Sequence, residues 1–168
     1  MVKILETQRL NIREFCYGDI EQLMRHSTEE SRKLHLADEI FDTVEKATDL
    51  ITMCIANYKK KEYPLPYAVE LKNPQILIGH ILLCPIECGI EIGYFISESY
   101  QNKGYATEAI KAFSPWAKAT FHLDILYAEV WKSNIASWKA VEKAGYTFLR
   151  EREQNHYGAL RVFKEYTF

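Results

Sequence analysis

The sequence has no long apolar run, few cysteines and no excess of charge of one sign. Its most apolar stretch, residues 76–86, is interrupted by Gly79, His80 and Pro85, and it is too short to span a bilayer. The first residues lack the unbroken apolar core of a signal peptide. The 21 Lys and Arg against 23 Asp and Glu give a formal charge of −2, which provides no basic surface for nucleic acid or anionic lipid. We therefore expect a cytoplasmic protein that binds neither membranes nor nucleic acid.

The cysteines and histidines show no metal-binding pattern. Cys84 and Cys88 are separated by three residues, but zinc needs further ligands and His80 alone does not complete a site. Cys16 and Cys54 add no framework spacing, and a chain of this size needs no disulfide. We predict no metal.

Two common nucleotide-binding motifs are also missing. The chain contains neither the Walker pattern nor the G-x-G-x-x-G fingerprint. It has no repeat, low-complexity segment or Pro/Gly/Ser-rich linker that would divide it. With 48% apolar and 13% aromatic residues, a chain of 168 residues can build one core, so we expect a single domain over residues 1–168.

Hydrophobic periodicity predicts an α+β protein. The β-rich runs 67–71, 76–84 and 88–96 are separated by turn residues and predict antiparallel hairpins. Strand and helix patterns alternate after them, which indicates a parallel pair in a mixed sheet. Asp42 followed by Glu45 is typical of a capping box and predicts a helix start. The other expected elements are strands at 3–15, 125–131, 146–150 and 159–168 and helices at 18–24, 103–121 and 134–144.

The segment from Gln101 to Ala106 lies between a predicted strand and a predicted helix. Gly104 allows the backbone to bend or to approach a ligand closely. Free N–H groups at a helix start, together with the helix dipole, attract phosphate groups, and Lys103 could add one cation. The pattern favours a pyrophosphate site, although a glycine and an amide can also simply shape a turn.

Five stretches of the chain carry a resemblance to one known family: Glu6-Thr-Gln-Arg-Leu-Asn-Ile-Arg13, Glu91-Ile-Gly-Tyr-Phe-Ile96, Gln101-x-x-Gly104-x-Ala106, Thr107-Glu108-Ala109, and Asn134-Ile-Ala-Ser137 followed by Glu142-Lys-Ala-Gly-Tyr146. In this order they are similar to the opening strand, the central strand, the pyrophosphate loop, the helix behind that loop, and the final helix with its turn in the GNAT superfamily of acetyl-CoA-dependent N-acetyltransferases. The resemblance covers nearly the whole chain and is closest to the branch of RimJ/RimL-type ribosomal-protein N-terminal acetyltransferases.

The resemblance implies a GNAT-like fold and a donor site. The fold would have a central, mostly antiparallel sheet of about seven strands with a splayed parallel pair, flanked by about four helices. Acetyl-CoA would be the donor, with its thioester carbonyl polarised by main-chain groups at the end of the central strand. A lysine near the last helix end would reach the 3′-phosphate, unless it is simply solvated. The residues implied to contact the donor are Phe95, Ile96, Ser97, Gln101, Asn102, Lys103, Gly104, Tyr105, Ala106, Thr107, Asn134, Ser137 and Lys143.

Transfer to an amine also needs a base and a proton for the leaving thiolate. Glu91 interrupts an apolar strand, where desolvation would raise its pKa toward a useful value; alternatively it lies at an exposed strand end or pairs with an arginine. Asn134 suits the N-cap of the last helix, and Ser137 on the same helical face could donate to the sulfur. The position of the family's usual tyrosine acid is Val141, which leaves Ser137, a water or another tyrosine for that role.

We therefore expect an acyltransferase that moves an acetyl group from acetyl-CoA directly to a primary amine, in a ternary complex, as a monomer or homodimer. The amine would be a peptide N-terminus or a small molecule. A non-catalytic acyl-CoA-binding module and a longer acyl donor such as succinyl-CoA are the alternatives, and Val141 argues for the first of them. The helices between Gly18 and Tyr58 would build the acceptor pocket, where the run 29–33 fits either helix or loop. Acidic residues in this region suit a cationic acceptor or form a solvated surface: Glu29, Glu30, Asp38, Glu39 and Asp42.

Overall fold

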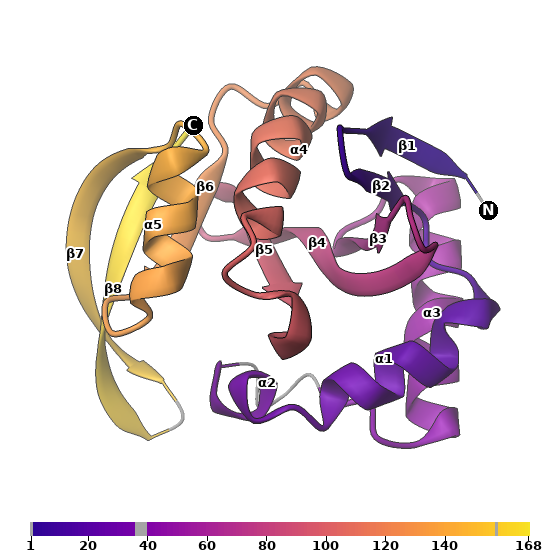
Figure 1. Ribbon diagram of the computed structural model, residues 1–168. Helices are drawn as coiled ribbons and strands as arrows, with labels where there is room; N and C mark the ends of the chain where they lie inside the picture. Colours follow the sequence, from indigo (N-terminus) through magenta and orange to yellow (C-terminus); the bar gives the residue numbers. More distant parts are fainter. Residues whose placement is uncertain (1, 36–39, 157) are drawn as a thin grey trace.

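The computed structural model describes residues 2–35, 40–156 and 158–168. An eight-stranded sheet with the order β1-β2-β3-β4-β5-β6-β8-β7 forms its centre (Figure 1). All neighbouring strands pair antiparallel except β5 and β6, so the predicted mixed, mostly antiparallel α+β fold is confirmed, with eight strands in place of about seven. The strands are β1 (Lys3–Glu6), β2 (Leu10–Arg13), β3 (Leu65–Leu71), β4 (Ile76–Ile86), β5 (Gly89–Ile96), β6 (Tyr127–Trp131), β7 (Thr147–His156) and β8 (Ala159–Thr167).

Helices flank this sheet. The described ranges contain five α-helices, where about four were expected; the additional one is α2, in the segment that fitted either helix or loop. None of the helices in these ranges is both long and apolar enough to cross a membrane. The helices are α1 (Ile20–Ser27), α2 (Glu30–His35), α3 (Val44–Lys60), α4 (Tyr105–Phe121) and α5 (Ile135–Lys143), with short 3-10 turns at Tyr17–Asp19 and Glu98–Tyr100.

The N-terminal hairpin differs from the prediction. A single strand over 3–15 is wrong, because the chain reverses between β1 and β2, which pair antiparallel. The turn is closed by Thr7, whose backbone N–H donates to the Leu10 carbonyl and whose Oγ1 accepts from the Leu10 N–H, both at 2.9 Å. The Thr7 hydroxyl therefore stabilises the turn, and the sequence of the turn contains no glycine or proline that would predict the reversal.

The start of α3 is also displaced from the prediction. The N-cap is Thr43, whose Oγ1 accepts from the Lys46 backbone N–H at 3.2 Å, so the capping box of Asp42 and Glu45 is wrong. Asp42 instead forms an ion pair with Lys46 at 2.7 Å. The predicted apolar face is present, and its centre at Ala47 and Ile51 is fully buried.

Two hydrophobic clusters cover the two faces of the sheet. The larger cluster packs α4 and α5 against strand residues such as Tyr67 and Val69, whereas the smaller cluster packs α1 and α3 around Ala68. Tyr67, Ala68 and Val69 are consecutive in β3, and successive side chains of a strand point to opposite faces. We therefore call the two sides of the sheet the α4/α5 face and the α1/α3 face.

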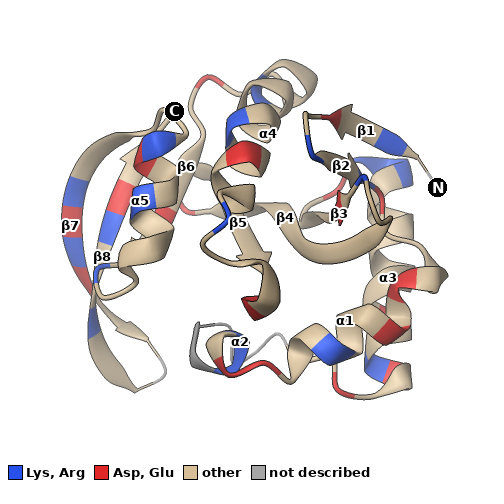
Figure 2. Ribbon diagram, viewed as in Figure 1, with Lys and Arg blue, Asp and Glu red and all other residues tan. Residues whose placement is uncertain are grey.

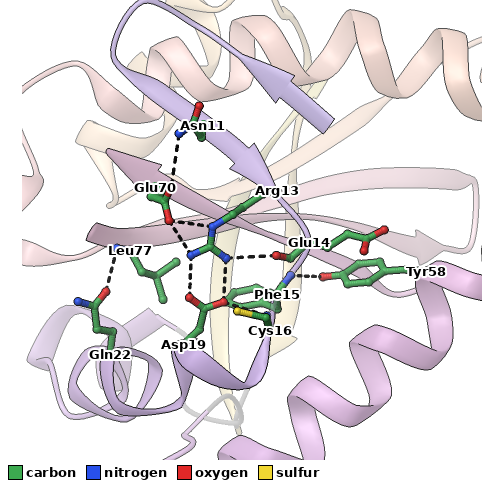
Figure 3. Close-up of polar contacts among 10 residues, drawn as sticks. All are labelled: Asn11, Arg13, Glu14, Phe15, Cys16, Asp19, Gln22, Tyr58, Glu70 and Leu77. Atoms are coloured by element: carbon green, nitrogen blue, oxygen red, sulfur yellow. Dashed lines mark hydrogen bonds and ion pairs between the residues drawn. The ribbon is translucent and has the colours of Figure 1, made fainter. Parts of the chain in front are cut away.

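A buried ionic cluster fixes α1 against the sheet (Figure 3). The Arg13 guanidinium on β2 donates to both carboxylate oxygens of Asp19, at 2.8 and 2.7 Å, and to Glu70 on β3 at 2.9 Å. Asn11 adds a hydrogen bond to Glu70. Removing one partner from such a buried set leaves an uncompensated charge, which typically costs about 3–5 kcal/mol. The cluster thus sets where α1 begins.

The sheet opens between β5 and β6. Their parallel pairing is limited to Glu91 opposite Tyr127, although β5 continues to Ile96 and β6 to Trp131. On its other edge β5 stays close to β4, because a Cβ at Gly79 would lie 2.0 Å from the Phe95 carbonyl oxygen and no larger residue fits there. Since β5 remains with β4, it is β6 that separates. The predicted splayed parallel pair is confirmed.

Candidate active site

A cavity of about 690 Å³ lies where β5 and β6 separate. Six consecutive β5 residues, 91–96, line it. Ile92 and Ile96 belong to the cluster on the α4/α5 face, so Glu91 and Phe95 point to the α1/α3 face. A cavity lined by both sets of side chains must pass through the sheet. One binding space is therefore open to both faces, and we call its narrow passage between β5 and β6 the slit.

On the α4/α5 face the cavity ends at the start of α4. Gly104 is the N-cap with φ of 81°, a left-handed conformation that favours glycine, and no side chain caps the helix. The first N–H groups of α4 are therefore available to an anion. Of the thirteen predicted donor-contacting residues, eleven line the cavity: Phe95, Ile96, Gln101, Asn102, Gly104, Tyr105, Ala106, Thr107, Asn134, Ser137 and Lys143.

The other two predicted donor residues have partners elsewhere. Lys103 donates its Nζ to the Ser99 carbonyl at 2.8 Å. Ser97 donates its backbone N–H to the Ile78 carbonyl at 2.8 Å and its hydroxyl to Glu29 at 2.6 Å. Because backbone groups alternate in direction along an antiparallel strand, the Ser97 bond to β4 places the N–H of Ile96 on the slit side.

Arg9, which sequence reasoning missed, braces the α4 start from the β1–β2 turn. Its Nε lies 2.6 Å from Glu108, its Nη1 donates to the Lys103 carbonyl at 2.9 Å, and its guanidinium lies 4.4 Å from the Tyr105 ring centroid. Thr7 also donates to Glu108 at 2.6 Å. Burial acts to raise the pKa of Glu108, but these hydrogen bonds and the Arg9 charge hold it below its usual value. No local pattern links residues 99 positions apart.

The start of α5 carries the next polar group. Asn134 Oδ1 accepts from the Ser137 backbone N–H at 3.2 Å, so the predicted N-cap is confirmed. The Ser137 hydroxyl lies 2.6 Å from the Tyr94 hydroxyl, which also donates to the Ser137 carbonyl at 2.8 Å. Burial raises the pKa of Tyr94 well above its usual value. Val141 is fully buried in the core, and the tyrosine that contacts the Ser137 hydroxyl is Tyr94.

On the α1/α3 face, Glu91 faces a second carboxylate. Desolvation, followed by the nearby charge of Glu129 on β6, raises the pKa of Glu91 to about 7. Both residues line the cavity. Arg152 on β7 donates to Glu129 at 2.5 Å and lies 2.6 Å from Glu165. The expected desolvation of Glu91 is thus confirmed. Arg152 forms its ion pair with Glu129, the residue beside Glu91.

Glu129 and Arg152 were not predicted, although one signal was available. In β6 a carboxylate at Glu129 stands between the buried residues Ala128 and Val130, the same pattern that singled out Glu91. Arg152 lies in a charged run of β7, where basic and acidic residues follow one another (Figure 2), and this run offers no such contrast. Its role depends on the pairing of β7 with β8, which brings it next to Phe163.

The remainder of the α1/α3 side is largely aromatic. His80 stacks on Phe95 with centroids 5.8 Å apart, and the Arg32 guanidinium of α2 lies 4.9 Å from the same ring. Burial lowers the pKa of His80 well below its usual value, so this ring is neutral. Trp131 and Phe163 line the cavity farther along.

Of the acidic residues expected near the acceptor, Glu29, Glu30 and Asp42 do not line this cavity. Glu30 and Asp42 are exposed, and each forms an ion pair with a nearby lysine, Lys33 and Lys46 respectively. Glu29 binds the end of β5. Asp38 and Glu39 lie outside the described residues. In the described ranges no group of three or more His, Cys, Asp or Glu residues is placed to hold a metal ion.

Comparisons with known proteins agree with this geometry. The family model described as acetyltransferase (GNAT) domain matches residues 9–147. The uncharacterized N-acetyltransferase YnaD of Bacillus subtilis (strain 168) is 29% identical over 143 residues, covering 84% of this chain and 81% of the relative. Among solved structures, a GNAT-family acetyltransferase from Bacillus anthracis has a TM-score of 0.80 at 24% identity and covers 100% of this chain and 98% of its own. RimL, a ribosomal L7/L12 α-N-protein acetyltransferase in complex with coenzyme A, has a TM-score of 0.85 at 18% identity, with 99% and 97% covered.

Proposed function

Because the chain belongs to the GNAT acetyltransferase family, we propose that it moves the acetyl group of acetyl-CoA directly to a primary amine, which is a peptide N-terminus or a small-molecule amine. One domain over residues 1–168 would carry the reaction. The observation behind the proposal is the cavity that passes through the slit, since two substrates can enter it from opposite faces and meet between β5 and β6.

The α4/α5 side fits the donor. The uncapped start of α4 offers backbone N–H groups and a helix dipole to a pyrophosphate, and Gly104 leaves room for its close approach. Lys103 and Lys143 contribute positive charge near the loop and at the end of α5. Asn134 and Ser137 line the path from the loop to the slit, where a pantetheine arm would run.

The end of β5 supplies the group that polarises the thioester. The Ile96 N–H is on the slit side, whereas the Ser97 N–H is used by β4. The Gln101 side chain donates to the Ile96 carbonyl at 2.8 Å, which belongs to the next peptide unit, and so restrains the backbone on the far side of Ile96. A fixed N–H aimed at the carbonyl oxygen stabilises the negative charge that develops there.

Glu91 serves as the base on the acceptor side. The amine arrives as an ammonium ion, and the Glu91 carboxylate accepts its proton. The neutral amine then attacks the thioester carbonyl carbon, a C–N bond forms, and the C–S bond breaks to release the CoA thiolate. The nitrogen, which is positively charged after the attack, gives up a second proton, and the thiolate takes it up to leave as CoA. A group with a pKa of about 7 is suited to this exchange at neutral pH.

The Ser137 hydroxyl stabilises the departing thiolate. The Tyr94 hydroxyl lies 2.8 Å from the Ser137 carbonyl and 2.6 Å from the Ser137 hydroxyl, so the position of that hydroxyl is fixed. Tyr94 has one proton, and when it donates that proton to Ser137 Oγ instead of to the carbonyl, Ser137 is free to donate a hydrogen bond toward the sulfur. This pair replaces the tyrosine that Val141 cannot supply.

The test is release of free CoA from acetyl-CoA, measured with a thiol reagent across a panel of amines. The panel spans polyamines, amino acids, aminoglycosides and peptides that begin with Ser or Ala, with succinyl-CoA as a second donor. Gly104→Glu, which places a carboxylate in the loop, is the donor-binding control. Amine-dependent release that this variant loses supports the proposal. Failure of acetyl-CoA to raise the melting temperature would contradict the donor site.

A further inference from the structure

The turn between α1 and α2 is bonded directly to the end of β5. Glu29 accepts the Ser97 hydroxyl at 2.6 Å with one carboxylate oxygen and the Glu98 backbone N–H at 2.7 Å with the other. In return, the Glu98 carboxylate accepts the Ser31 backbone N–H at 2.8 Å. Hydrogen bonds that involve carboxylates are the stronger kind. We call these three bonds the Glu29 clamp.

On one side, the clamp holds the segment that leads into the donor loop. Gln101 donates its side-chain N–H to the Ile96 carbonyl, and Lys103 donates Nζ to the Ser99 carbonyl, both at 2.8 Å. These bonds tie the donor loop to the end of β5 as one compact piece. A ligand that fixes the loop therefore also fixes the two residues that Glu29 binds.

On the other side, the clamp holds the wall of the acceptor side. Ser31 lines the cavity at the start of α2, and Arg32, which is 1% exposed, places its guanidinium over the Phe95 ring. In Figure 1, α2 lies near the segment that follows the end of β5. Movement of α2 would therefore change the shape of the acceptor side.

We propose that Glu29 is a positioning residue that couples the two substrate sides: binding of acetyl-CoA at the donor loop orders the α1–α2 turn on the opposite face of the sheet. The inference rests on the proposed donor site at residues 101–107. By linkage, an acceptor that orders α2 tightens acetyl-CoA binding by the same factor. Glu29 acts through Ser97 and Glu98 and contacts neither substrate.

The neighbouring residue provides a matched control. Glu30 is also a carboxylate of this turn, but its side chain is exposed and pairs with Lys33 at 2.8 Å. Glu29→Ala removes both accepting oxygens, whereas a glutamine could still accept from Glu98 and donate to the Ser97 hydroxyl. Glu30→Ala makes the same chemical change outside the clamp.

Hydrogen–deuterium exchange with and without acetyl-CoA tests the coupling in the full chain. In the wild type and in Glu30→Ala, acetyl-CoA should slow exchange both at residues 101–107 and, by about fivefold, at residues 28–32, in line with modest coupling between sites. In Glu29→Ala the loop should remain protected while protection at 28–32 is lost. Ser97→Ala, which removes one bond of the clamp, should give an intermediate value. Thermal unfolding of each variant checks that it is folded.

Two results would overturn the inference without touching the proposed function. The first is protection of residues 101–107 with no change at 28–32 in the wild type. The second is protection at 28–32 that persists in folded Glu29→Ala, because the coupling would then run through other contacts. If acetyl-CoA protects neither region, the donor site fails and the inference fails with it.

Discussion

The two sides of the slit are built in different ways. The proposed donor side lies mainly at the starts of α4 and α5, where backbone N–H groups are available to a ligand, and two short stretches of chain supply most of its residues. The acceptor side is made from side chains of α2, β4, β5, β6, β7 and β8. Backbone N–H groups present the same surface whatever the side chains are, whereas a surface of side chains changes with every substitution. The donor side therefore suits one constant ligand, and the acceptor side can differ between relatives.

The largest effect that separates the two sides is expected from Glu91→Gln. Loss of the base should lower kcat/KM by about 10²- to 10⁴-fold, the usual contribution of a positioned general base. The affinity for acetyl-CoA, measured by calorimetry, should stay within about twofold, because Glu91 lies on the other face of the sheet. Glu87→Gln, an exposed carboxylate in the β4–β5 turn, is the control. A fall in acetyl-CoA affinity that matches the fall in rate would show that the two sides are not separable.

The converse substitution is Gly104→Ala. A non-glycine residue at φ of 81° is strained by about 1–2 kcal/mol, so the loop should shift and bind acetyl-CoA about tenfold more weakly. The pH at which the rate is half-maximal should not change, since Glu91 is untouched. Calorimetry gives the affinity and a pH–rate profile gives the midpoint. A changed midpoint would contradict the independence of the acceptor side.

A smaller effect on the donor side is expected from Arg9→Ala. The substitution removes the bonds to Glu108 and to the Lys103 carbonyl, which hold the loop in place. Arg9 itself does not line the cavity. Acetyl-CoA affinity should fall about three- to fivefold, as for residues that act through a neighbour. Gln8→Ala, exposed in the same turn, should have no effect. Equal losses in both variants would point to damage of the β1–β2 turn as a whole.

The smallest effect is a shift in the pH profile. Deprotonated Glu91 is the active form, so kcat/KM should rise with pH and reach half its plateau near pH 7. Glu129→Gln removes the like charge that raises the pKa of Glu91 and keeps the Arg152 charge that lowers it. The midpoint should therefore move to lower pH. Glu151→Gln, which affects an exposed pair with Lys132, should leave it in place. A midpoint that moves upward would exclude Glu129 as the neighbour that sets it.

The same contrast decides what could be predicted from sequence. The donor side was visible because its residues, such as Gln101, Gly104 and Asn134, are close together in the chain and occupy a recognisable order. Most helices and strands were also predictable from periodicity and turn residues. The N-terminal strand was misjudged because a threonine hydroxyl closes the reversal, and that bond leaves no compositional trace.

The acceptor side was harder because it depends on distant contacts. Glu91 was singled out as a candidate base from the chemistry of its own strand, but Arg152 reaches Glu129 only through the register of β7 on β8 and β8 on β6. Glu29 meets Ser97 across 68 positions of sequence. No periodicity encodes such a pairing, so sequence reasoning placed Glu29 among general acidic residues.

The burial of Glu91 also has a consequence for the balance between folding and activity. Its pKa is raised from 4.5 to about 7, so the folded state binds its proton more tightly than the unfolded chain does. The contribution of this group to the stability of the fold is therefore greatest below about pH 4 and declines as pH rises toward 7, by on the order of 3 kcal/mol. The carboxylate becomes able to accept a proton over the same interval. If Glu91 is the base that we propose, the charge that allows it to act also opposes the folded state, and a cationic acceptor beside it would offset that effect.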